Sequence, residues 1–273
     1  MIDDLSSLPA DEPDELQRFR LDERVALVAG GSGGIGVRIC AALAGVGADV
    51  AVVGRSEERL ADARAAVEEA GRQPLPLTAD LTTTADAETA VAATVERFGR
   101  LDVLVNAVGG GAGTALYPAE QYPEAEWDRI VDLNLRSALL ASQAAARAMI
   151  AAGRGGRILN ISSVRGQLGI NAGYSAYVAA KGALNALTRQ HATEWAKHGI
   201  TVNAISPTFV RTPQVESMLA DRAFYDALVS RIPLGRIAAT DDLVGAVLFF
   251  CSDASSFVTG QVLTLDGGLT ATQ

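Results

Sequence analysis

Cysteine and histidine are scarce in this chain, which argues against disulfides and metal sites. Its 273 residues include two cysteines and two histidines. Cys40 and Cys251 lie within apolar patterns of helical period, which favours two small core residues in a reducing compartment. His191 and His198 have no cluster of cysteine, histidine or aspartate around them. We therefore expect no metal ion and a cytoplasmic protein.

Long apolar runs and a surplus of positive charge are also missing. No uninterrupted apolar stretch approaches the ~20 residues that a membrane helix needs. The formal net charge is −9, whereas binding to nucleic acid requires a basic surface. We therefore expect that the protein binds neither a membrane nor nucleic acid. A local basic pocket is still compatible with this composition.

The beginning of the chain lacks the basic start and apolar middle of a secretory signal. Residues 1–20 are acidic and contain proline instead. This composition predicts a loose N-terminal arm over residues 1–20. No linker or internal repeat divides the remainder, and its length suits one large domain, so we expect a single domain over residues 21–273.

Short apolar runs alternate with longer helical stretches from residue 24 onward. The helical stretches are amphipathic or rich in alanine, and they include residues 57–70, 86–98 and 124–151. Such alternation predicts an α/β fold, a doubly wound parallel sheet of about seven strands with helices on both faces. The expected strands are residues 25–29, 50–53, 75–78, 103–106, 157–161, 201–205 and 262–265.

A glycine-rich turn follows the first expected strand and opens a helix. Residues 29–36 read Ala-Gly-Gly-Ser-Gly-Gly-Ile-Gly. Glycines there let backbone N–H groups approach a pyrophosphate, and the helix N-terminus favours its negative charge. This position in a βαβ series favours a Rossmann-type dinucleotide site over a plain turn. The expected contacts are Gly30, Ser32, Gly34, Ile35 and Gly36.

Tyr177 and Lys181 are spaced to meet on one face of a helix. A free tyrosine has a pKa near 10, and a positive charge a few ångströms away lowers it. The pair can thus transfer protons near working pH. Upstream, an apolar run ends at Ser163, whose hydroxyl could hold a substrate oxygen against Tyr177. Tyr174 is a rival phenol, but Val178 stands where its lysine partner would be.

Further residues complete a set of motifs in a fixed order, namely Asn106 and Gly109, Asn134, residues 203–207 and residues 266–268. With the glycine-rich turn, Ser163, Tyr177 and Lys181, this set resembles the short-chain dehydrogenase/reductase family over about residues 19–269. The resemblance implies hydride transfer between a nicotinamide dinucleotide and a secondary alcohol or ketone. It implies a catalytic tetrad of Asn134, Ser163, Tyr177 and Lys181. Asn134 would bend its helix and anchor a water that links Lys181 to solvent.

The sequence departs from the family pattern around the nicotinamide. Ala29, Ala107 and Thr208 stand where the family usually has threonine, asparagine and glycine, and the interval from Ser163 to Tyr177 is one residue longer. These departures remove no catalytic group, but together they predict altered loops around the nicotinamide. The resemblance also implies further cofactor contacts from Asp80, Leu81, Asn106, Gly109, Tyr177, Lys181, Pro207, Val210 and Thr212.

The second expected strand is followed by Gly54, Arg55 and Ser56, without the acidic residue that binds the adenine ribose and repels a 2′-phosphate. Gly54 leaves room, and the planar cation of Arg55 suits a phosphate. NADP(H) is therefore the preferred cofactor, with NAD(H) as the other possibility. Two alternatives remain open: Arg55 pairs with Glu57 or Glu58, and Ser56 caps the following helix.

Two segments could border the substrate. Residues 109–113 are rich in glycine and could form either a wall of the substrate cleft or a plain surface turn. Residues 209–232 stand where related enzymes carry a lid. Apolar lid residues could line a pocket or simply pack a helix. They are Met218, Leu219, Phe224, Tyr225 and Leu228.

The substrate stays open: a sugar acid, a 3-ketoacyl thioester, or a cyclic ketone or steroid all fit. Two other functions compete, an enoyl-thioester reductase and a non-catalytic dinucleotide-binding sensor. A homotetramer is expected as well. Small residues on the helix around Lys181 (Ala179, Gly182, Ala183 and Ala186) and the apolar run 258–269 would permit close pairing of subunits.

Overall fold

A single parallel sheet forms the centre of the computed structural model, which describes residues 15–111 and 113–272. Its strand order is β3-β2-β1-β4-β5-β6-β7, and every neighbouring pair is parallel. The doubly wound fold is confirmed, and each strand lies within two residues of its expected bounds. The strands are β1 (Val25–Ala29), β2 (Asp49–Gly54), β3 (Pro74–Thr78), β4 (Val103–Asn106), β5 (Gly156–Ile161), β6 (Ile200–Pro207) and β7 (Val262–Leu265).

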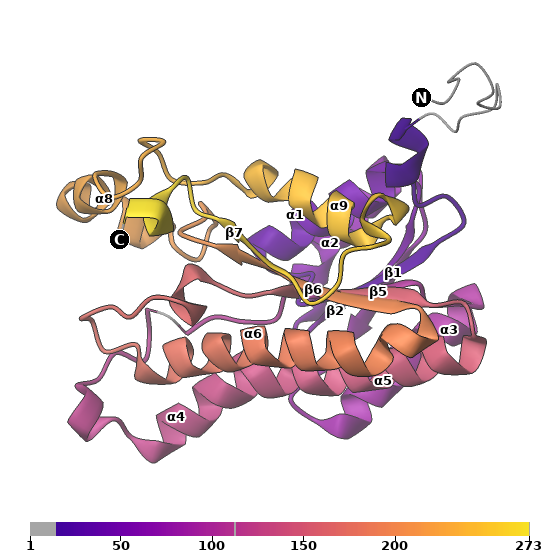
Figure 1. Ribbon diagram of the computed structural model, residues 1–273, viewed down its shortest axis with the longest axis horizontal. Helices are drawn as coiled ribbons and strands as arrows, with labels where there is room; N and C mark the ends of the chain where they lie inside the picture. The colour runs from indigo at the N-terminus through magenta and orange to yellow at the C-terminus, as the bar shows by residue number, and fades with distance from the viewer. Residues whose placement is uncertain (1–14, 112, 273) are drawn as a thin grey trace, which may run out of the picture.

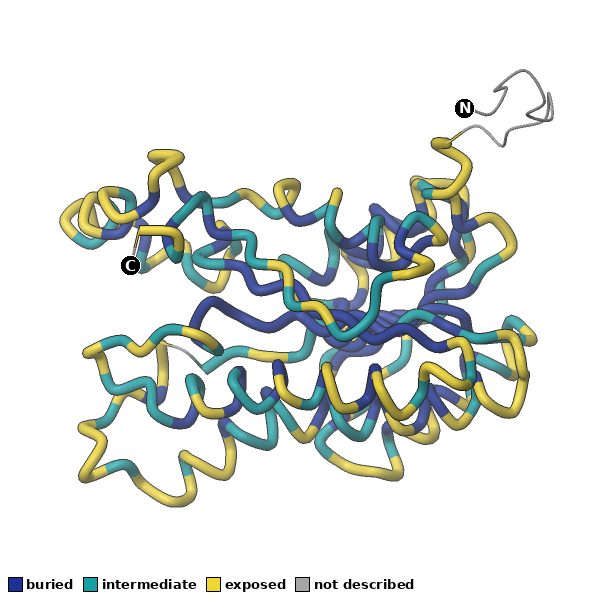
Figure 2. Tube along the Cα trace, in the orientation of Figure 1, coloured by how far each residue is buried: buried dark blue, intermediate teal, exposed yellow. Residues whose placement is uncertain are grey.

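Helices cover both faces of the sheet (Figure 1). Alternate residues of a strand point to opposite faces, so Ala26 and Val28 of β1 join one apolar cluster and Leu27 and Ala29 the other. Figure 2 shows the central strands as a buried layer between more exposed helices, whereas the edge strands β3 and β7 are partly exposed. The first face carries α1 (Gly34–Gly45), α2 (Glu57–Glu69) and α9 (Val244–Cys251); the second carries α3 (Thr84–Phe98), α5 (Ser137–Ala152) and α6 (Ser175–Trp195).

The edge position of β3 explains its two prolines, Pro74 and Pro76. Proline lacks the N–H that a sheet ladder needs, so it is tolerated where one side of the strand has no partner. β3 pairs with β2 alone within the described residues. The order of the strands reverses at β1, whose two neighbours are β2 and β4. At such a switch point, the loops after the strands diverge and leave a crevice.

The helical stretch expected over residues 124–151 is divided in two. α4 (Glu124–Val131) is separated from α5 by a π-helical turn, Asp132–Arg136. Asn134 lies within this turn, and its side-chain Nδ2 donates to the carbonyl oxygen of Ile130 at 2.9 Å. Extra residues of this kind interrupt a helix at sites where a side chain enters the backbone ladder.

The segment after β6 crosses over the carboxyl edge of the sheet. It contains α7 (Glu216–Leu219) and α8 (Arg222–Val229), and Val210 pairs with Ala238 as it leaves the strand. We call residues 209–232 the lid segment. It therefore lies above the crevice that the strand order creates.

The expected N-terminal arm falls mostly on residues 1–14, which lie outside the described residues. Its remaining part includes a 3-10 helix, Glu15–Phe19 (η2), whose Arg18 donates to the carbonyl oxygen of Asp253 at 3.2 Å. No helix in the described part of the chain has both the length and the apolar character needed to cross a membrane. Over the same residues, no group of three or more histidine, cysteine, aspartate or glutamate side chains could hold a metal ion.

Candidate active site

A cavity of about 410 Å³ opens at the carboxyl edge of the sheet. Its walls come from the turn after β1, the loop after β4, the segment between β5 and α6, the first half of α6, and the lid segment. All these strands are parallel, so the loops that follow them meet at one edge. Among the expected site residues, the walls include Gly30, Gly34, Ile35, Gly36, Gly109, Ser163, Tyr177, Lys181, Pro207, Val210 and Thr212.

The glycine-rich turn is packed so closely that side chains have no space. Gly30 has a φ of +82°, and a Cβ there would lie 2.7 Å from the carbonyl carbon of Ala107. A Cβ on Gly36 would lie 2.2 Å from the carbonyl oxygen of Gly30. Gly33 precedes α1 without any side-chain cap, which leaves N–H groups at the start of that helix for an anion. The turn thus fits a dinucleotide pyrophosphate.

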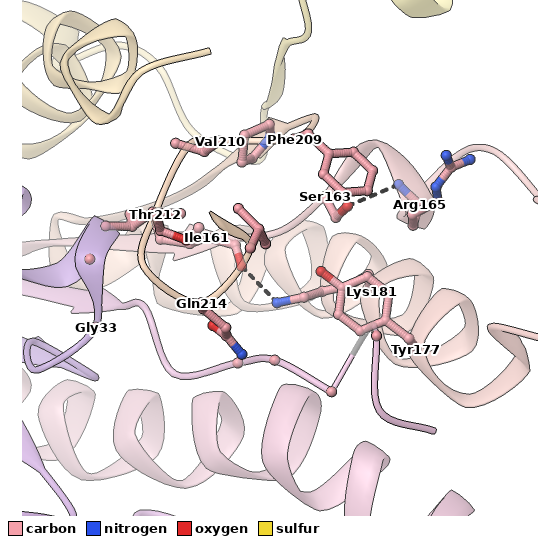
Figure 3. Close-up of a pocket in the computed structure, with 18 of the residues that line it drawn as sticks. Gly33, Ile161, Ser163, Arg165, Tyr177, Lys181, Phe209, Val210, Thr212 and Gln214 are labelled. Carbon is pink, nitrogen blue, oxygen red and sulfur yellow. Dashed lines mark hydrogen bonds between the residues drawn. The ribbon is translucent and has the colours of Figure 1, made fainter. Parts of the chain in front are cut away.

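Ser163 and Tyr177 come together from different elements. Ser163 lies two residues after the end of β5, and its Oγ accepts a hydrogen bond from the backbone N–H of Arg165 at 3.1 Å. Tyr177 lies on α6 and points into the same cavity (Figure 3). Burial raises the pKa of Tyr177, while a hydrogen bond from Ser163 and the positive charge of Arg165 oppose that shift. The phenol is therefore protonated at neutral pH.

Lys181 lies one helical turn after Tyr177 and is 3% exposed. Its Nζ donates to the carbonyl oxygen of Ile161 at 2.9 Å and lies 5.8 Å from the centre of the Tyr177 ring. Burial lowers the pKa of Lys181 from 10.5 to about 8. The expected lowering of the Tyr177 pKa by Lys181 is not seen in this structure: burial raises the pKa of Tyr177, and the positive charge that opposes this rise is that of Arg165.

Asn134 fixes the loop after β4 to the π-helical turn. Its Oδ1 accepts from the N–H of Gly110 at 3.1 Å, and its Nδ2 donates to the carbonyl oxygen of Gly110 at 3.0 Å. A Cβ on Gly109 would lie 3.0 Å from Asn134 Oδ1 and 3.3 Å from Lys181 Nζ. The absence of a side chain at Gly109 therefore lets the asparagine and the lysine approach the same stretch of backbone.

Several expected cofactor residues lie outside the cavity wall. Asn106 is buried, and its Nδ2 donates to Ser142 and Asn160, both at 2.8 Å. Leu81 packs in the core on the α3 face, and Asp80 Oδ1 accepts from the backbone N–H and hydroxyl of Thr82 at 3.1 and 2.8 Å. These three residues support the neighbouring loops through packing and hydrogen bonds.

The end of β2 carries an exposed Arg55 beside the glycine-rich turn. Within residues 15–111 and 113–272, Arg55 takes part in no ion pair, so the expected alternative pairing with glutamate is not found. Ser56 precedes α2 without a capping hydrogen bond from its side chain. Gly54 does not leave free space: a Cβ there would lie 2.6 Å from Ser32 Oγ, so Ser32 occupies it.

The lid segment closes against the start of α1. A Cβ on Gly34 would lie 3.0 Å from Thr212 Cβ and 3.1 Å from Pro213 Cδ. Met218 lines the cavity. The other four apolar lid residues pack into a separate cluster around Ile232. They therefore serve internal packing and do not line the pocket. They are Leu219, Phe224, Tyr225 and Leu228.

Sequence reasoning did not single out several residues of the cavity wall. Arg165 stands two residues after Ser163, a spacing that could have drawn attention to it, whereas nothing in the sequence pattern distinguishes Ile170 or Gln214. Tyr174, the rival phenol that has no lysine partner, also lines the cavity. Sequence motifs identify only the residues that belong to them. The other residues of the cavity wall are brought together by contacts between segments far apart in the chain.

Comparisons with known proteins agree with this geometry. A family model described as enoyl-(acyl carrier protein) reductase matches residues 29–270. The crystal structure of a short-chain type dehydrogenase/reductase from Mycobacterium marinum is 35% identical, with a TM-score of 0.87 over 94% of this chain and 99% of that one. The chain belongs to the short-chain dehydrogenase/reductase family. It is therefore an oxidoreductase, and the resemblance seen in its motifs is confirmed.

Two further members of the short-chain dehydrogenase/reductase family are similar over nearly their whole length. A gluconate 5-dehydrogenase of Gluconobacter oxydans is 38% identical over 252 residues, 92% of this chain and 96% of that protein. A gluconate 5-dehydrogenase from Burkholderia cenocepacia, crystallised with NADP and tartrate, is 36% identical, with a TM-score of 0.87 over 94% of this chain and 98% of that one.

The burial of Lys181 predicts a variant with higher stability. We expect Lys181→Met to raise the free energy of unfolding of the cofactor-free protein by roughly 2 kcal/mol at pH 7. It removes a buried cation whose pKa has fallen from 10.5 to about 8, and it loses one hydrogen bond. The exposed Lys197, changed to methionine, is the matched control and should alter stability little.

The pH dependence gives the sign of this effect. Between pH about 8 and 10.5, the unfolded chain binds more protons at Lys181 than the folded chain, so wild-type stability rises with pH there. The advantage of Lys181→Met should therefore shrink across that window. Denaturant unfolding at several pH values measures the difference in free energy of unfolding between the variant and the unmodified protein. A difference that stays constant up to about pH 10 would contradict the lowered pKa of Lys181.

Proposed function

We propose that this enzyme catalyses reversible hydride transfer between NADP(H) and a secondary alcohol or ketone, with Tyr177 as the general acid and base. The observation that carries the proposal is the shared cavity of the glycine-rich turn, Ser163, Tyr177 and Lys181. The nicotinamide, when bound, supplies or accepts the hydride. The chain's own residues hold the substrate oxygen and move its proton.

Ser163 and Tyr177 act on the substrate oxygen. Ser163 Oγ accepts the Arg165 N–H, which leaves its own O–H to donate to that oxygen or to Tyr177. Because burial raises the pKa of Tyr177, the protonated phenol is its resting form. This form donates the proton that a reduced carbonyl requires. The geometry therefore supports reduction at neutral pH.

Lys181 and Asn134 have supporting roles in this proposal. With a pKa of about 8, Lys181 can exchange a proton near working pH and pass it toward Tyr177. Lys181 would also bind the nicotinamide ribose. Asn134 holds the Gly110 backbone beside the lysine, and a water at its Oδ1 would link Lys181 to solvent. Asn134 is a positioning residue.

Arg55 and Ser56 support the preference for NADP(H) over NAD(H). Both follow β2, and no carboxylate occupies the place where one would repel a 2′-phosphate. The Arg55 guanidinium suits a phosphate, and the Ser56 hydroxyl could donate a further hydrogen bond. The Burkholderia cenocepacia relative, crystallised with NADP, supports the same preference.

Among the candidate substrates, a sugar acid has the support of the gluconate 5-dehydrogenases named above. A 3-ketoacyl thioester and a cyclic ketone or steroid remain alternatives. The description of the matching family model also keeps an enoyl-thioester reductase as a second candidate. A non-catalytic sensor would bind the dinucleotide without turnover. Nicotinamide absorbance with carbonyl, alcohol and 2-enoyl thioester panels separates these possibilities.

Removal of the Tyr177 hydroxyl tests the catalytic role. We expect Tyr177→Phe to bind cofactor normally but to lose turnover by about 10³-fold or more, because the loss falls on proton transfer in the transition state. Tyr174→Phe, which removes a neighbouring phenol, should change KM more than kcat. Steady-state kinetics on the best panel substrate, with cofactor affinity measured separately, decides this; substantial turnover by Tyr177→Phe would refute the role.

Cofactor preference is tested by kcat/KM with NADP(H) and NAD(H). We expect the unmodified enzyme to prefer NADP(H), and Arg55→Leu to lose much of that preference because one charge-assisted contact with the 2′-phosphate disappears. Arg59→Leu on the exposed side of α2 controls for charge. Gly54→Asp is a less direct test, since Ser32 would have to move. Equal or better use of NAD(H) by the unmodified enzyme would overturn the preference.

We also propose a homotetramer. Ala179 and Ala186 are exposed on α6, so they are available to contact another subunit. Phe257, near β7, and Leu263, on β7, are large apolar residues that are also exposed. Small side chains permit close approach of paired helices. Sedimentation at micromolar concentration should show four subunits, and Ala179→Arg should shift the distribution to smaller species. A monomer for the unmodified protein would disprove this proposal.

A further inference from the structure

Arg165 is a buried arginine in the wall of the active-site cavity. It lies on a short 3-10 turn, Val164–Gly166 (η5), and is 7% exposed. In Figure 3, Ser163, Tyr177 and Lys181 lie between Arg165 and Gly33 of the glycine-rich turn. The guanidinium therefore belongs to the end of the cavity away from the dinucleotide-binding turn.

The Arg165 guanidinium has few hydrogen-bond partners and no counter-ion within the described residues. It takes part in no ion pair over residues 15–111 and 113–272, and its one hydrogen bond runs from Nη1 to the carbonyl oxygen of Gly169 at 3.2 Å. An arginine side chain offers five N–H donors. None of its nitrogens is both sealed from solvent and without a partner, and Arg165 lines the cavity.

A buried cation without a counter-charge is costly, and its surroundings here raise that cost. Burial lowers the pKa of Arg165, and the nearby positive charge of Arg231 acts in the same direction. An arginine nevertheless stays protonated in a protein. One end of the cavity thus carries positive charge in a chain whose formal net charge is −9.

We propose that Arg165 binds a carboxylate of the substrate, so that this enzyme acts on hydroxy acids or keto acids rather than on neutral alcohols and ketones. The inference rests on the hydride transfer proposed above. A guanidinium matches a carboxylate through two parallel N–H···O hydrogen bonds. The bound carboxylate would also provide the counter-charge that the described residues do not.

The position of Arg165 relates this carboxylate to the reacting atoms. Arg165 and Tyr177 line the same cavity of about 410 Å³, and the positive charge of Arg165 opposes the rise in the pKa of Tyr177 that burial causes. Ser163 is also nearby, because its Oγ accepts the Arg165 backbone N–H. One small acid bound in this cavity could therefore contact both Arg165 and Tyr177. Tyr174, whose phenol also lines the cavity, is a second donor for the same anion.

Paired probes with and without a carboxylate test the inference. D-gluconate and D-sorbitol form one pair, and 4-hydroxycyclohexanecarboxylate and its carboxamide form another. We expect the unmodified enzyme to favour the acid of a pair, and Arg165→Gln to lower kcat/KM for that acid by about 10- to 100-fold, mainly through KM. The neutral member should change by less than about threefold, because it makes no charge-assisted bond.

Two further variants make the result specific. Arg165→Lys keeps the charge but not the paired donors, so it should lose less than Arg165→Gln, and again only on acids. Arg211→Gln removes a half-exposed arginine whose partner is Glu216 at 2.8 Å, and it should leave both members of each pair unchanged. Unaltered NADPH affinity shows that a variant is folded; if Arg165→Gln fails this check, Arg165→Lys decides.

The outcomes separate this inference from the proposed function. Equal use of both members of each pair by the unmodified enzyme, or equal losses on both in Arg165→Gln, overturns the carboxylate site and leaves hydride transfer intact. Lack of turnover with these probes and with the whole carbonyl and alcohol panel contradicts hydride transfer instead. Calorimetric titration of gluconate into the NADP⁺-bound protein then decides the carboxylate site: binding lost in Arg165→Gln but kept in Arg211→Gln supports it, and equal binding refutes it.

Discussion

The close backbone contact between the turns after β1 and β4 determines the shape of the active site. A Cβ on Gly30 would lie 2.7 Å from the Ala107 carbonyl carbon, so these turns touch where the strand order reverses. The contact sets one wall of the crevice and directs the start of α1 toward it. Gly109, Asn134 and Lys181 then approach each other in the adjoining loop, because Gly109 also lacks a side chain.

Burial gives the titratable groups of the cavity their opposite shifts. The same low-dielectric surroundings raise the pKa of Tyr177 and lower that of Lys181, so both groups move toward their neutral forms. Arg165 is the exception, because its guanidinium keeps its charge when buried. The cavity thus combines a proton donor, a group that titrates near pH 8 and a fixed cation. Each would suit a different part of the acid substrate proposed above.

Buried charged groups of the cavity oppose the stability of this fold, whereas the apolar packing of the sheet supplies it. Lys181 and Arg165 are almost fully buried, and each makes one side-chain hydrogen bond within the described residues. The strands compensate with apolar side chains on both faces, each face packed against its own set of helices. A rigid sheet of this kind can hold polar groups in unfavourable surroundings at its edge.

The sequence by itself determined the fold, because hydrophobic periodicity and glycine placement are local properties. All seven strands, the glycine-rich turn and the meeting of Tyr177 with Lys181 could be predicted, since strand alternation and helical spacing need no distant partner. Only the tertiary structure decided how Arg165 is buried, that Ser32 fills the space beside Gly54, and that four apolar lid residues pack away from the cavity. Those facts depend on contacts between segments far apart in the chain, which no periodicity encodes.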